Sequence, residues 1–96
     1  MSEATTIEAE TTLRRTDRAV HGDLPERTLL LDVDAGTAVR LNSTGAWVWE
    51  QLEQPRQVGE LAEGLAQRFE IDEGRALDDV VAFAREMERR ELLAAS

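Results

Sequence analysis

Two short strand-like segments, residues 28–33 and 37–41, are joined by Asp34-Ala35-Gly36. This pattern restricts the structures that the middle of the chain can form. Both segments are rich in apolar residues and contain Val and Thr, which favour extended backbone. A three-residue connection with glycine last is typical of a tight hairpin, because glycine readily adopts the positive φ of the last turn position. We therefore predict an antiparallel hairpin here.

Three helical segments are expected after the hairpin. In the second, apolar residues recur at intervals of three and four from Val58 to Phe69, which places them on one face of a helix. Side chains that can accept a hydrogen bond from the first helical turn precede the first and third segments. The expected ranges are about 43–53, 58–69 and 73–91, with Asn42 or Ser43 as the first cap and Asp72 as the third.

A weaker strand signal covers residues 14–21, where the apolar content is low. Together with the hairpin and the helices, it predicts an α+β, winged-helix-like domain. In this domain a two- or three-stranded antiparallel sheet comes first and three helices follow. Leu92-Leu93 are expected to pack back on the core.

The chain has 96 residues, enough for one domain with one modest core. Residues 1–12 are rich in Thr and Glu, so we expect a disordered tail there and a single domain over residues 13–96. The position of Trp47, on the surface or in the core, is left open. The expected buried set is Val48, Trp49, Leu52, Leu61, Leu65, Phe69, Val80, Phe83 and Met87.

Charge narrows the possible partners. Twenty acidic side chains oppose eleven basic ones, a formal net charge of −9. Proteins that hold phosphates usually carry a basic face, so we expect neither a nucleic-acid nor a membrane partner. No apolar run approaches the roughly 18 residues of a membrane span, and the acidic N-terminus does not resemble a signal peptide. The expected location is cytoplasmic.

No pattern for catalysis, a cofactor or a metal is present. The chain has no cysteine and one histidine, His21, with no nucleophile or orienting carboxylate set beside it by a motif. Asp32 and Asp34 precede a glycine as in a calcium loop, but an EF-hand needs a glutamate where Ser43 stands. We therefore predict a protein that is not an enzyme and has no catalytic residue, cofactor or metal site.

The segment Leu41-Asn42-Ser43-Thr44-Gly45-Ala46, followed by Trp47 and Trp49, resembles the PqqD family. In that family a strand ends in Leu-Asn-x-Thr-Gly-Ala, with an apolar residue and a tryptophan after it. The likeness continues through the apolar spacing of residues 58–69 and 79–93 and covers about residues 14–93. Departures at residues 53–55 and at Gln57 concern only a turn and a helix cap.

Members of this family are RiPP recognition elements, which bind the leader segment of ribosomally made, post-translationally modified peptides. The resemblance implies that a precursor leader adds as a strand beside residues 37–41 and packs against the third helix. It also implies a partner maturase, either a radical-SAM enzyme or a leader protease. The expected peptide contacts are Thr37, Ala38, Val39, Arg40, Leu41, Leu77, Asp78, Val81 and Arg85.

Independently of the resemblance, strand addition needs only an exposed strand edge and side-chain pockets. Arg40 would guard such an edge against aggregation. Two alternatives stay open: a winged-helix DNA-binding or transcription-related module, and an acidic protein–protein adaptor. The first would need a basic third helix, whereas Asp78, Asp79 and further acids interrupt its arginines.

Overall fold

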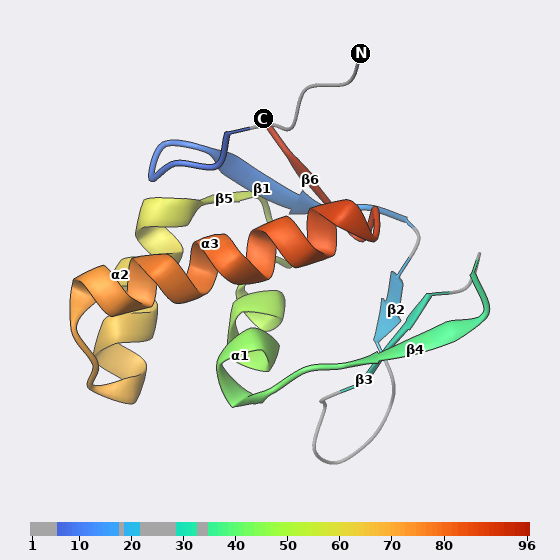
Figure 1. Cartoon of the computed structure of the whole chain (residues 1–96), viewed down its shortest axis with the longest axis horizontal. Coiled ribbons are helices and arrows are strands. Elements are labelled where there is room, and N and C mark those ends of the chain that lie inside the picture. The colour runs from blue at the N-terminus through green and yellow to red at the C-terminus, as the bar shows by residue number, and fades with distance from the viewer. Residues whose placement is uncertain (1–5, 18, 22–28, 33–34) are drawn as a thin grey trace.

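The structure is a computed structural model that describes residues 6–17, 19–21, 29–32 and 35–96 (Figure 1). Its strands form two three-stranded antiparallel sheets, with strand orders β5-β1-β6 and β2-β3-β4. The elements are β1 (Thr12–Arg15), β2 (Ala19–His21), β3 (Leu29–Asp32), β4 (Thr37–Arg40), α1 (Ser43–Gln51), β5 (Arg56–Gln57), α2 (Val58–Phe69), α3 (Glu73–Arg89) and β6 (Leu93–Ala95).

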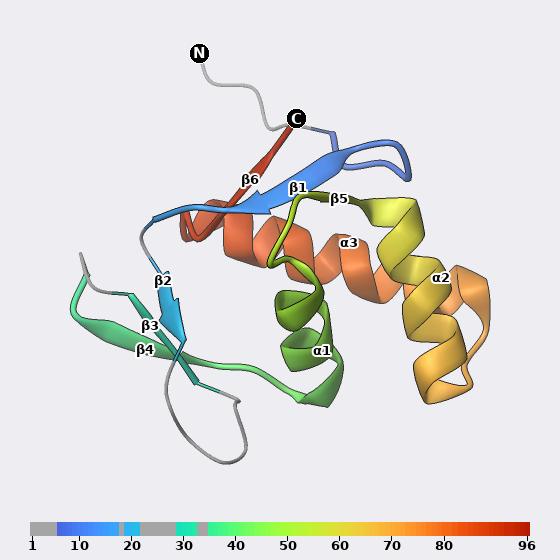
Figure 2. The same ribbon diagram turned by 180° about the vertical axis from the view of Figure 1, so that it is seen from behind.

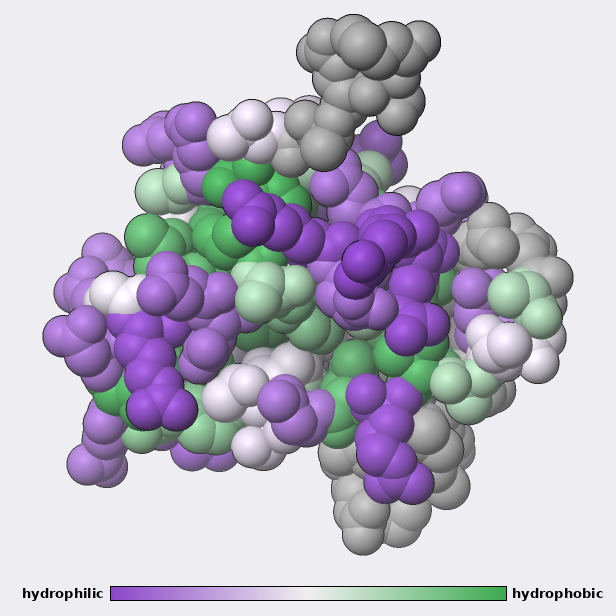
Figure 3. Space-filling model, viewed as in Figure 1, coloured by the Kyte–Doolittle hydropathy of each residue, from purple (hydrophilic) through white to green (hydrophobic). Residues whose placement is uncertain are grey.

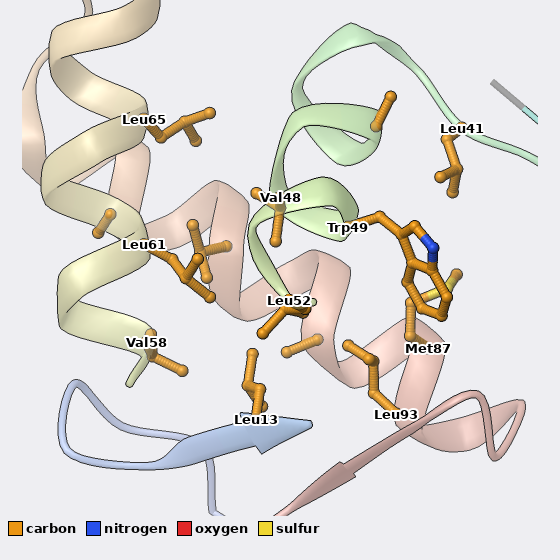
Figure 4. Close-up of a cluster of buried hydrophobic side chains, with 14 of the residues drawn as sticks. Leu13, Leu41, Val48, Trp49, Leu52, Val58, Leu61, Leu65, Met87 and Leu93 are labelled. Carbon is orange, nitrogen blue, oxygen red and sulfur yellow. The ribbon is translucent and has the colours of Figure 1, made fainter. Parts of the chain in front are cut away.

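The hydrophobic core lies between the three helices and the β5-β1-β6 sheet (Figures 1 and 4). Helix α3 crosses α1 and α2, and the β2-β3-β4 sheet lies on the side of α1 away from α2 (Figure 2). The close-up shows apolar side chains from β1, β6, the three helices and the segment that follows β4 pointing into this space. They include Leu13, Leu41, Val48, Trp49, Leu52, Val58, Leu61, Leu65, Met87 and Leu93.

The predicted fold class, an antiparallel sheet followed by three helices, is confirmed. Helix α2 has the expected bounds, and the hairpin pairs β3 with β4 around Gly36, whose φ is +69°. The Asn42 side chain caps α1 by accepting a hydrogen bond from the Gly45 N–H at 2.8 Å. Asp72 caps α3 in the same way, at 2.9 Å from the Gly74 nitrogen. Local sequence therefore sets these elements directly.

The single weak strand predicted over residues 14–21 is wrong in detail. The segment divides into β1 and β2, which belong to different sheets. β1 lies between β5 and β6, two strands that the sequence did not indicate, and Leu93 belongs to β6. Each partner of β1 is distant in sequence, so the pairing depends on the packing of the helices and leaves no local signal.

The disordered tail expected over residues 1–12 does not hold for its described part. Ile7 is buried, with an exposed fraction of 5%. The N–H of Gly59 donates to the Ala9 carbonyl at 2.8 Å, and that of Val58 donates to the Thr11 carbonyl at 2.9 Å. These bonds satisfy donors at the start of α2, which no helical carbonyl can reach. Residues 1–5 lie outside the described residues.

The expected core is correct except at its two phenylalanines. Trp49 is 1% exposed, whereas Phe69 and Phe83 are only partly buried against the core. Trp47 is also half-buried, and its ring covers Gly64 on α2 so closely that a Cβ there would lie 2.8 Å from the indole. Three partly buried aromatic side chains, Trp47, Phe69 and Phe83, are therefore accessible at the surface, and Phe83 borders a cleft.

Strand β1 is joined to α1 through Arg15. Its Nη2 donates to the carbonyl of Trp49, and its guanidinium lies 4.7 Å from the centroid of the Trp49 ring. Burial lowers the pKa of Arg15, while the nearby carboxylates of Glu53 and Glu50 oppose that shift. Because this contact joins the first strand to the first helix, it adds to the apolar packing of the β5-β1-β6 sheet.

Candidate functional site

Strand β4 is an edge strand of its sheet. β3 pairs with one side of it, and within the described residues no strand pairs with the other. Val39 points into the core, whereas Thr37, Ala38 and Arg40 are exposed. The backbone N–H and C=O groups on its outer side are therefore accessible to another extended chain.

A cleft of about 690 Å³ runs beside this strand, between the start of α1 and one face of α3. Figure 3 shows apolar surface in this part of the molecule, framed by polar side chains. The cleft is lined by Val39, Arg40, Leu41, Asn42, Ser43, Thr44, Gly45, Val48, Leu65, Arg75, Asp79, Ala82, Phe83, Glu86, Met87 and Arg90.

The turn from β4 into α1 packs closely against α3 and forms one wall of the cleft. A Cβ on Gly45 would lie 3.2 Å from the Phe83 ring and 3.1 Å from the Asn42 side-chain oxygen, so glycine permits the close approach of α1 and α3. The Thr44 hydroxyl donates to the same Asn42 oxygen at 3.0 Å. The Asn-x-Thr-Gly pattern thus has a structural reason: its asparagine caps α1, and its glycine leaves room for the Phe83 ring.

The charges on the α3 side are partly balanced among themselves. The Glu86 carboxylate accepts a hydrogen bond from Arg90 at 2.8 Å and another from Arg89. The bond from Arg90, and then that from Arg89, lowers the pKa of Glu86. Glu86 therefore stays ionised, with two guanidinium groups to balance it.

The residues expected on the strand side lie in the cleft or beside it. Val39, Arg40 and Leu41 line the cleft, and Thr37 and Ala38 continue the same exposed edge. This half of the predicted site rests on the hairpin, whose register follows from local turn chemistry.

The residues expected on the third helix face elsewhere. Leu77, Asp78, Val81 and Arg85 do not line the cleft. Leu77 and Val81 pack against the core, and Leu77 also borders a separate hollow near the start of α2. At about 100° per residue, they lie on a different side of α3 from the residues that face β4. Those are Arg75, Asp79, Ala82, Phe83, Glu86, Met87 and Arg90.

One sequence signal indicated the face of α3 that lines the cleft. An aromatic residue, Phe83, stands between charged residues at helical spacing, Asp79 and Glu86, although the expected buried set includes it. A half-buried aromatic ring on a charged face is typical of a contact surface.

Other kinds of site have no support in the part of the chain that the structure describes. No group of three or more His, Cys, Asp or Glu side chains is placed to hold a metal ion among these residues. Within the same residues, no helix has both the length and the apolar character needed to cross a bilayer. The side chain of His21 lies outside the described set.

Comparison with known proteins gives a family and a fold. The sequence model of the family "Coenzyme PQQ synthesis protein D (PqqD)" matches residues 27–93. No curated protein sequence matches the chain.

Three solved structures share the fold. TbiB1 in complex with the TbiA(beta) leader peptide is 24% identical, with a TM-score of 0.75 over 83% of this chain and 93% of that one. Lasso peptide synthetase B1 complexed with the leader peptide is 20% identical, with a TM-score of 0.75 over 85% of this chain and 96% of that one. The PqqD truncation of Methylobacterium extorquens PqqCD is 15% identical, with a TM-score of 0.76 over 94% and 96%.

Proposed function

The chain belongs to the PqqD family, and we propose that it is a standalone RiPP recognition element. In this proposal it is a non-catalytic domain that binds the leader segment of a ribosomally made precursor peptide. The observation that carries the proposal is the outer edge of β4, which no strand of the described residues pairs with, beside the cleft under α3. A strand edge supplies backbone hydrogen bonds, and a neighbouring cleft supplies pockets for side chains.

In this mechanism the leader extends the β2-β3-β4 sheet by one strand. Alternate leader residues then point toward α3, because successive side chains of a strand face opposite sides. They meet Ala82 and Phe83, with Met87 in the floor of the cleft. Backbone pairing provides affinity for any extended segment, and these side chains provide the selection among segments.

The fold relatives support the same function. Two of them were solved in complex with leader peptides: TbiB1 with the TbiA(beta) leader peptide, and lasso peptide synthetase B1 with the leader peptide. The PqqD truncation is described as a functional, stand-alone RiPP recognition element. This chain shares their fold and has an accessible strand edge.

A binding domain of this kind acts by delivering its peptide to a modifying enzyme. We therefore propose a maturase as the second partner, either a radical-SAM enzyme or a leader protease, and a cytoplasmic location, where precursor peptides are made. The formal charge of −9 argues against the DNA-binding alternative.

The test is a fluorescence-anisotropy titration of labelled candidate leader peptides, taken from short open reading frames found near the gene for this chain. We expect saturable binding that is lost in Ala82→Trp, which fills the cleft from an exposed position on α3. Equal binding by this variant would contradict the site. Sequence-dependent binding of duplex DNA at about 0.1 M salt would favour the winged-helix alternative instead.

A further inference from the structure

The cleft beside β4 differs in charge from two other hollows on the described surface. Three arginines and two carboxylates line it: Arg40, Arg75, Arg90, Asp79 and Glu86. A hollow between β6 and the end of α3 is lined by three carboxylates and no arginine: Asp17, Glu88 and Glu91. A hollow near the starts of α2 and α3 has four carboxylates and no arginine: Glu10, Glu60, Glu63 and Glu73. The cleft therefore differs from these two hollows in that arginines line it, although the protein as a whole is acidic.

Two of these arginines are placed to pair with a carboxylate of a ligand. Arg90 is paired with Glu86. Within the described residues, by contrast, neither Arg40 nor Arg75 makes a salt bridge, and both residues are exposed. Arg40 ends β4, and Arg75 lies in the first turn of α3, so they approach the cleft from its two walls.

We propose that the peptide segment held in this cleft is acidic, and that its carboxylates pair with Arg40 and Arg75. The inference deepens the proposed function and rests on it. A guanidinium group matches the geometry of a carboxylate and forms charge-assisted, often bidentate hydrogen bonds with it. An apolar side chain of the same segment lies on Phe83, the partly buried ring in this cleft.

The net charge of the protein is compatible with an acidic ligand. At physiological salt the Debye length is about 8 Å, so the distant acids that give the charge of −9 are largely screened at the cleft. Arg40 and Arg75 repel a basic segment from the cleft. The arginines thus favour acidic segments and also disfavour basic ones, and both effects contribute to specificity.

A random peptide library displayed on phage, panned against the purified chain, tests this proposal. Peptides whose binding is lost in Ala82→Trp are the cleft binders, and we expect them to be enriched in Asp and Glu. Replacing those residues by Asn and Gln in a synthetic copy should weaken binding roughly tenfold. Panning against Arg75→Glu should select basic peptides instead.

The matched control is Arg85→Glu, because Arg85 is an exposed arginine of the same helix that lies outside the cleft. It should bind the acidic peptides as the parent does, whereas Arg40→Glu and Arg75→Glu should each lose roughly tenfold in affinity. Circular dichroism melts establish that all three variants are folded. The Asn and Gln peptides test the same pairing without any change in the protein.

The experiment distinguishes failure of the proposed peptide-binding function from failure of the acidic preference. If no selected peptide is sensitive to Ala82→Trp, the cleft does not bind peptides and the proposed function itself fails. If cleft binders appear without an excess of acids and bind Arg40→Glu and Arg75→Glu equally well, the acidic preference is overturned, while the peptide-binding function stands.

Discussion

The β5-β1-β6 sheet joins segments from both ends and the middle of the chain, whereas the β2-β3-β4 sheet uses only residues 19–40. The first sheet buries Leu13 and Leu93 against all three helices, and Arg15 joins it to α1. The second sheet lies beside the helices, and its outer strand exposes three of its four residues. The two sheets therefore differ in role: the β5-β1-β6 sheet closes the domain, and the β2-β3-β4 sheet has the exposed edge strand at which we propose that the peptide binds.

Shortening a buried side chain of the β5-β1-β6 sheet should have the largest effect on the stability of the domain. Leu13 is 1% exposed in the middle of β1, so Leu13→Ala is expected to cost about 2–5 kcal/mol of unfolding free energy. That is a large share of the stability of a small domain. Urea unfolding followed by circular dichroism measures it. A loss of under about 1 kcal/mol would show that this sheet is not needed to close the core.

Phe83→Ala should separate stability from binding. Because Phe83 is only partly buried, we expect a cost below that of Trp49→Ala, which should be about 3–5 kcal/mol. The lost ring should also weaken leader binding, since it lines the cleft. The two variants are compared by urea unfolding and by titration of the leader at a temperature where both are folded. Equal destabilisation by the two changes would place Phe83 in the core.

A proline scan over Thr37–Leu41 tests the presented edge. Proline removes a backbone donor, and along a strand the N–H groups point alternately toward β3 and away from it. Alternate positions should therefore lose leader affinity by about tenfold while the domain stays folded. Anisotropy titration and circular dichroism are the measurements. Uniform tolerance across the five positions would falsify strand addition at β4.

The smallest expected effect concerns Glu86. Its pKa is lowered by the hydrogen bonds from Arg90 and Arg89, so its ionised form is favoured in the folded chain. This contribution to stability is present above the pKa of an unfolded glutamate and is lost as the pH falls through the lower folded value. A side-chain NMR titration should show the lowered pKa, and Arg90→Gln should raise it. An unchanged pKa in that variant would exclude Arg90 as its main cause.

Much of the fold was predictable because its signals are local. Gly36 supplies the positive φ of the hairpin turn, and Asn42 and Asp72 cap their helices through bonds to nearby backbone. The apolar spacing from Val58 to Phe69 determines a helix by itself. The strand side of the candidate site, Val39 to Leu41, followed from the same hairpin.

Two features were decided only by the tertiary structure. Strand β1 becomes a strand between β5 and β6 because packed helices bring residues 56–57 and 93–95 to it, and pairing over such separations leaves no periodic trace. The second feature is the orientation of α3. The apolar periodicity of its sequence predicts an apolar face and a charged face. The rotation of the helix in the fold decides which face meets β4. That rotation depends on close contacts such as Phe83 on Gly45, which form only when distant segments pack together.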